Sequence, residues 1–146
     1  GVAAGPLWLI NAMARLQSHS SGNPASISQA AAVAAFEGPQ EFLLDWRERF
    51  RARRDLCVAA INAIPGLSTP VPDGAFYCMV DAAPLMARFG GEGPHADEAL
   101  CLHLLEQGVA VVAASAFGGR DGFRISFAAD EATLEEALRR IADAVV

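Results

Sequence analysis

The chain has 146 residues, 53% of them hydrophobic and 19% charged, which is typical of one globular domain with a sizeable core and excludes a disordered chain. Its formal net charge of −6 argues against a nucleic-acid partner, because binding to phosphates needs clustered cations. Its longest apolar run, residues 108–119, is too short to span a bilayer, so no membrane partner is expected.

Helices dominate the first part of the chain. Apolar residues recur with a helical period over residues 6–17, a small polar loop is expected at 18–24, and residues 25–36 are alanine-rich and apolar. A long amphipathic helix is predicted over residues 41–64, where a Pro-Gly pair ends it. Its apolar stripe is predicted to consist of Leu43, Trp46, Phe50, Cys57, Ile61 and Ile64.

The second part mixes short strands with helices. Strands are expected at residues 75–81, 109–112 and 123–127. Helices are expected at residues 84–89, at 96–107 and from the capping residue Asp130 to the end of the chain. This order predicts an α/β or α+β two-layer domain, in which helices cover one side of a small, mostly antiparallel or mixed sheet.

The cysteines and histidines indicate neither a disulfide framework nor a metal site. Cys57, Cys78 and Cys101 are far apart in the sequence, and no signal peptide is visible, so we expect a reduced, cytoplasmic protein. Cys101 and His103 are two residues apart on a predicted helix and therefore point to different sides, and with His95 they have no fourth ligand at metal-site spacing.

Two groups of arginines could bind anions. The segment RERFRARRD, residues 47–55, carries five arginines, but Phe50 lies on the core stripe, and Arg47, Arg51 and Arg54 share the opposite face, which favours a solvated helix surface. Arg124 lies in a strand whose alternate residues are apolar. It either faces solvent or binds a carboxylate, for which the planar guanidinium is well suited.

The polar segment SHSSGNP, residues 18–24, precedes a helix. Its hydroxyls, including those of Ser20 and Ser21, and its backbone amides could hold a phosphate, although an ordinary polar loop with a helix cap would look the same. No P-loop or GxSxG motif is present.

The chain contains no lysine, since all 11 of its cations are arginines. Chemistry that needs a lysine amine therefore cannot be performed by this chain alone. The chain also begins without methionine and within an apolar run, so we expect it to be part of a longer protein.

Several segments resemble one family in the same order. GVAAGP at residues 1–6, QSHSSGNPASISQAA at 17–31, PDGAFYCMVD at 72–81, GVAVVAASAFG at 108–118 and FRISFA at 123–128 are similar to segments of fold-type I, class I aminotransferases. The bacterial aspartate aminotransferase subgroup is the most similar. These enzymes use pyridoxal 5′-phosphate as an electron sink and move an amino group between an amino acid and a 2-oxo acid.

The resemblance implies a domain division and a set of roles. Residues 1–23 would be the trailing edge of the large cofactor domain and residues 24–146 the small C-terminal domain, with the cofactor-binding lysine upstream of Gly1. This chain would then contain no catalytic residue and would contribute substrate binding and domain closure.

The resemblance also implies site residues. Arg124 would bind the substrate α-carboxylate. Phe76 and Tyr77 face opposite sides of their strand, and we expect Phe76 to face the substrate cleft and Tyr77 to pack within the domain, with the reverse assignment left open. Ser20 and Ser21 would point toward the cofactor phosphate of the partner subunit in a homodimer.

Two other interpretations stay open. The chain could be the effector-binding, aminotransferase-like domain of a transcription regulator whose DNA-binding domain lies upstream. It could also be a non-catalytic dimerisation module.

Overall fold

The computed structural model describes residues 2–146. The chain divides into two compact units, one that ends at Phe42 and one that comprises Leu43–Val146, and each is described by itself. No helix among the described residues is both long enough and apolar enough to cross a membrane.

The first unit consists of helices α1, Leu7–Ser20, and α2, Ser26–Glu37. Pro6 precedes the first turn of α1, where its missing N–H leaves no helical hydrogen bond unmade. The chain leaves α1 through Gly22, whose φ of +75° is accessible mainly to glycine. Neither helix has a buried side chain.

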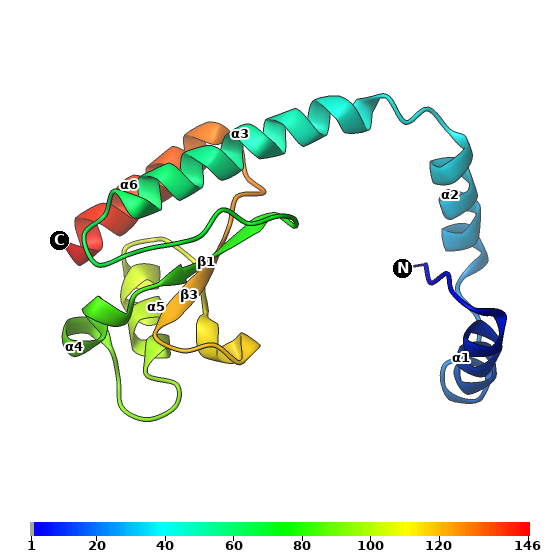
Figure 1. Ribbon diagram of the computed structural model, residues 1–146, viewed down its shortest axis with the longest axis horizontal. Coiled ribbons are helices and arrows are strands. Elements are labelled where there is room, and N and C mark those ends of the chain that lie inside the picture. Colours follow the sequence, from blue (N-terminus) through cyan, green and yellow to red (C-terminus); the bar gives the residue numbers. More distant parts are fainter. Residues whose placement is uncertain (1) are drawn as a thin grey trace. The chain divides into compact units, whose positions relative to one another are not determined.

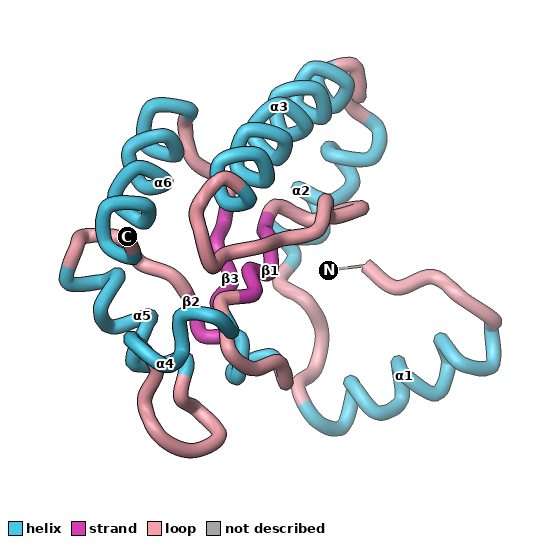
Figure 2. The backbone as a smooth tube through the Cα atoms, turned by 60° about the vertical axis from the view of Figure 1, so that its left-hand side comes forward, coloured by secondary structure: helices cyan, strands magenta, loops and turns pink. Residues whose placement is uncertain are grey.

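The second unit is built around a three-stranded antiparallel sheet with the strand order β1-β3-β2 (Figure 2). The strands are β1, Tyr77–Asp81, β2, Val112–Ala113, and β3, Gly122–Ser126. The strand predicted at 109–112 is therefore shorter than expected: it begins three residues later and ends one residue later.

The remaining elements of this unit are helical (Figure 1). They are α3 (Phe42–Asn62), η1 (Ala83–Leu85), α4 (Met86–Phe89), α5 (Asp97–Glu106), η2 (Ala114–Phe117) and α6 (Glu131–Val145). The predicted cap of α6 is confirmed, because the Asp130 carboxylate accepts a hydrogen bond of 2.9 Å from the Thr133 N–H. The predicted fold class is confirmed as well: helices and a small antiparallel sheet form an α/β domain.

One face of the sheet forms the core with three of the helices. Its side chains alternate along the strands, so Cys78, Val80, Phe123 and Ile125 are buried. Helices α3, α5 and α6 bury the side chains Cys57, Val58, Ile61, Leu100, Leu104, Leu134, Leu138, Ile141 and Val145 in the same cluster. The opposite face of the sheet carries the half-exposed side chains of Met79 and Val112.

The predicted stripe of α3 is only half correct. Cys57, Ile61 and Ile64 are buried, but Leu43 and Trp46 are 47% and 57% exposed. The helical period was identified correctly, but it cannot show how far along the helix the core extends. The predicted division into residues 1–23 and 24–146 concerns domains of a longer protein and stays a prediction.

Candidate functional site

Arg124 lies in the middle of the central strand of the sheet. Its neighbours across the sheet are Met79 in β1 and Val112 in β2. The residues on either side of it, Phe123 and Ile125, are 0% and 4% exposed and anchor the strand in the core. The alternation along the strand therefore directs the Arg124 side chain to the open face of the sheet, as predicted.

Two aromatic rings flank the Arg124 guanidinium. Its central carbon, Cζ, lies 4.4 Å from the centre of the Tyr77 ring and 4.1 Å from the centre of the Phe117 ring. Tyr77 belongs to β1 and Phe117 to η2, directly after β2, so the rings approach from opposite sides of β3. Within residues 2–146, no carboxylate forms an ion pair with Arg124 and no acceptor bonds its N–H groups.

A buried carboxylate holds the turn that carries Phe117. Asp97, in the first turn of α5, is 1% exposed, and its Oδ2 accepts a hydrogen bond of 2.9 Å from the Ser115 N–H. Its Oδ1 and the Ser115 Oγ are buried, and neither has a hydrogen-bond partner among the described residues. The carboxylate therefore fixes η2 two residues before the ring that contacts Arg124.

The side chains of Phe76 and Tyr77 do not lie where we expected. The Tyr77 ring lies against Arg124, on the open face of the sheet. The side chain of Phe76 is 44% exposed, and the centre of its ring lies 4.5 Å from that of Tyr77. The expectation that Tyr77 packs inside the domain is therefore wrong, whereas a substrate-binding role for Phe76 stays a prediction.

Ser20 and Ser21 lie at the end of α1, and the loop expected at 18–24 begins only after the helix. The hydroxyl of Ser20 donates to the Leu16 carbonyl oxygen at 2.9 Å, and that of Ser18 donates to Arg15 in the same way. These bonds to carbonyl oxygens of the preceding turn hold both serines within the helix. Both Ser20 and Ser21 are exposed.

Three arginines in the arginine-rich part of α3 pair with acidic residues of the same helix. Arg51 lies 3.1 Å from the Glu48 carboxylate, and Arg54 lies 2.7 Å from that of Asp55. The Arg47 guanidinium is 3.6 Å from Glu48. These cations therefore differ from Arg124, which pairs with no carboxylate within residues 2–146.

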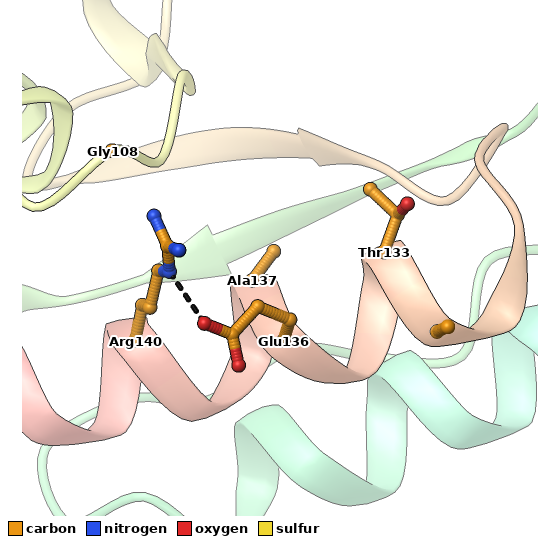
Figure 3. Close-up of a pocket in the computed structure, with 6 residues that line it drawn as sticks. Gly108, Thr133, Glu136, Ala137 and Arg140 are labelled. Carbon is orange, nitrogen blue, oxygen red and sulfur yellow. Dashed lines mark hydrogen bonds and ion pairs between the residues drawn. The ribbon is translucent and has the colours of Figure 1, made fainter.

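A hollow of about 420 Å³ beside α6 contains another paired arginine (Figure 3). Its lining consists of Gly108, Ala132, Thr133, Glu136, Ala137 and Arg140. The Nε of Arg140 donates to the Glu136 carboxylate at 2.8 Å. Hydrogen bonds from Arg139 and then Arg140 lower the pKa of Glu136 to about 2, so this carboxylate stays charged and neutralises the hollow.

The cysteine thiols are not placed for nucleophilic chemistry. Burial, followed by the nearby Asp97 and Glu98, raises the pKa of Cys101 to about 11. Cys57 and Cys78 are buried side by side, and the hydrogen bond between them raises the pKa of the first and lowers that of the second. At 0% and 1% exposure, neither thiol is accessible to a substrate.

Known proteins are similar to this chain in sequence. The family model for aminotransferase class I and II matches residues 1–141. The aspartate aminotransferase of Rhizobium meliloti (strain 1021) is 50% identical over 99% of this chain, and the aspartate/prephenate aminotransferase of Cereibacter sphaeroides is 48% identical over 97%.

The structures agree with the sequences. A crystal structure of the aspartate aminotransferase from Rhizobium meliloti superposes on 98% of this chain with a TM-score of 0.84 and 49% identity. In each of these comparisons, the chain spans 36% of the length of the relative.

Proposed function

Since the chain belongs to the class I and II aminotransferases, we propose that it is the C-terminal part of an enzyme that transfers an amino group between an amino acid and a 2-oxo acid. The names of its relatives favour an enzyme over the regulator and the dimerisation module. They also suggest substrates such as aspartate and prephenate. All such substrates carry the α-carboxylate that the chain would bind.

We assign the binding of this carboxylate to Arg124. The observation that carries the assignment is a guanidinium on the open face of the sheet, held between two rings and without an acidic partner in residues 2–146. A guanidinium pairs with a carboxylate through two parallel hydrogen bonds, which fix both the position and the rotation of the substrate. This alignment is what a proton transfer at the substrate Cα requires.

The test is the change Arg124→Lys in the full-length protein. Lysine keeps the charge but cannot form the two parallel hydrogen bonds. We expect kcat/KM to fall by roughly thirtyfold to a hundredfold, the scale of a hydrogen bond to a charged group.

The control for this test is Arg120→Lys, an exposed arginine in the turn before β3. It should leave kcat/KM unchanged. If Arg124→Lys also stays within about threefold of the unmodified protein, Arg124 is only a strand residue that faces solvent.

The family implies pyridoxal phosphate as cofactor, and it serves as the electron sink when bound. The residues of this chain do not form its covalent site, because the chain contains no lysine, and the Ser20 hydroxyl is bonded within α1. We therefore assign no step of the cofactor chemistry to this chain.

Alone, the chain should be catalytically inactive. After incubation with pyridoxal phosphate and dialysis, it should retain no cofactor absorbance. A side-chain adduct that borohydride makes permanent would contradict this expectation.

We also propose that the parent is a cytoplasmic homodimer in which the end of α1 approaches the partner's cofactor phosphate. Ser21 suits this role better than Ser20, because its hydroxyl has no hydrogen-bond partner in the described part of the chain. Sedimentation of the full-length protein tests the proposal, which a fully active monomer would refute.

A further inference from the structure

We propose that Tyr77, Phe117 and Asp97 are positioning residues for Arg124: the two rings hold the guanidinium in one plane, and the buried carboxylate holds the second ring in place. This inference rests on the proposed function, since it explains how Arg124 is kept ready for a carboxylate.

Two aromatic rings contact the Arg124 guanidinium. With ring centres 4.4 Å and 4.1 Å from its Cζ, the guanidinium is attracted to both rings. Arg53 lies over the Phe50 ring and Arg88 over the Phe89 ring, whereas two rings contact Arg124. Two rings limit the rotation of a long side chain that would otherwise sample many rotamers.

The two rings do not occupy the hydrogen-bond donors of the guanidinium. Neither a phenol ring face nor a phenyl ring face accepts a hydrogen bond in the plane of the guanidinium. The N–H groups at the edge of Arg124 therefore stay available for a planar ligand such as a carboxylate. A salt bridge to an acidic side chain would also have fixed the guanidinium, but it would have occupied these same donors.

Phe117 is held in place by η2, the turn that carries it. This ring is 49% exposed, so packing alone does not fix it. Its position depends on η2, which the Asp97 carboxylate holds through the Ser115 N–H at 2.9 Å. The Asp97 carboxylate is 1% exposed, and burying a charged group costs free energy. We assign it the role of holding η2 in one conformation.

The experiment compares variants that remove a ring with variants that keep it, in the full-length protein. Phe117→Leu and Tyr77→Leu remove a ring, whereas Phe117→Tyr and Tyr77→Phe retain one. For Asp97, Asp97→Ala removes the acceptor, and Asp97→Asn retains an oxygen that can accept the Ser115 N–H. The readouts are the dissociation constant of succinate, a dicarboxylate without an amino group, and separate values of kcat and KM.

We expect each leucine variant to weaken succinate binding and raise KM by roughly threefold to thirtyfold, with a smaller change in kcat. The variants that keep a ring should stay within about twofold of the unmodified protein. Asp97→Ala should resemble Phe117→Leu, and the two changes together should have little more effect than either alone, because both act through one ring. Asp97→Asn should restore most of the binding.

The outcomes separate this inference from the proposed function. If Arg124→Lys weakens succinate binding but Phe117→Leu and Tyr77→Leu do not, Arg124 binds the carboxylate unaided and the inference is wrong. If Arg124→Lys leaves succinate binding unchanged, the proposed function itself fails. Phe117→Leu decides the question even if Asp97→Ala or Tyr77→Leu does not fold, because its side chain lies at the surface.

Discussion

The two units of the chain differ in what stabilises their helices. In the second unit, α3, α5 and α6 bury apolar side chains against a sheet. In the first, α1 and α2 have no buried side chain, and six of their large apolar side chains are more than half exposed: Leu7, Trp8, Leu16, Ile27, Val33 and Phe36.

The difference shows that a helical sequence pattern and a folded environment are separate properties. Isolated helices of 14 and 12 residues are marginal in water, so α1 and α2 need partners that lie outside their own unit. Large exposed apolar surfaces of this kind mark contact sites. The chain therefore contains a domain with its own core and a segment whose large apolar side chains are exposed.

Hydrogen exchange of the isolated chain should reveal this difference most strongly. Amides of β3 exchange only on global unfolding, so we expect their protection to exceed that of α1 and α2 by more than about a thousandfold. Mass spectrometry or NMR with residue resolution measures this directly. Equal protection of the two units would show that α1 and α2 are stable without a further partner.

A matched pair of phenylalanines provides the next test. Phe123 is 0% exposed in the core of the second unit, and Phe36 is 72% exposed in α2. Phe123→Ala should lower the free energy of unfolding by about 3–5 kcal/mol, because it leaves a cavity. Phe36→Ala should change it by less than about 0.5 kcal/mol. Urea unfolding of both variants is the measurement, and similar losses would contradict the comparison.

A pair of glycines extends the test to the backbone. A Cβ at Gly122 would collide with the carbonyl oxygen of Val80 in the neighbouring strand, whereas a Cβ at Gly5 would meet no atom within 4 Å. Gly122→Ala should therefore destabilise the second unit by about 1–3 kcal/mol, as overpacking usually does. Gly5→Ala serves as the control, and its melting temperature should match that of the unmodified chain.

The smallest effect concerns acid and α6. Hydrogen bonds from Thr133 lower the pKa of Asp130, and those from Arg139 and Arg140 lower that of Glu136 to about 2. A lowered folded-state pKa means that these contacts stabilise the fold above the unfolded value of about 4 and are lost as pH falls through each folded-state pKa, which for Glu136 lies at about 2.

The melting temperature should therefore decrease over this pH range, and less steeply in Asp130→Ala than in the control Glu135→Ala. Glu135 is a suitable control because it is an exposed residue of the same helix. Identical pH profiles for the two variants would show that the cap contributes nothing.

Most elements of the fold could be predicted because their signals are local. Prolines and glycines marked the helix ends to within a few residues, and alternation along β3 placed Arg124 on the face opposite Phe123. The errors arose where hydrogen bonds or packing extend beyond the local pattern. Ser20 continues α1 through its bond to Leu16, and the first turns of α3 lie beyond the core although their period is unbroken.

The surroundings of Arg124 could not be predicted in the same way. Tyr77 lies beside Arg124 because of the register between β1 and β3, two strands that are far apart in the sequence. No local sequence pattern specifies this register. Phe117 belongs to η2, which lies between two predicted strands where no element was expected. Asp97 looks like an ordinary acidic residue at a helix start, and only its burial reveals that it binds Ser115.

The central claim is that Arg124 binds the substrate carboxylate, and a crystal structure of the full-length protein with a bound amino acid or dicarboxylate tests it most directly. The account predicts two parallel hydrogen bonds of about 2.7–2.9 Å between the guanidinium of Arg124 and the α-carboxylate oxygens, with the Tyr77 and Phe117 rings still on either side. A ligand whose α-carboxylate binds elsewhere, with Arg124 left in solvent, would contradict it.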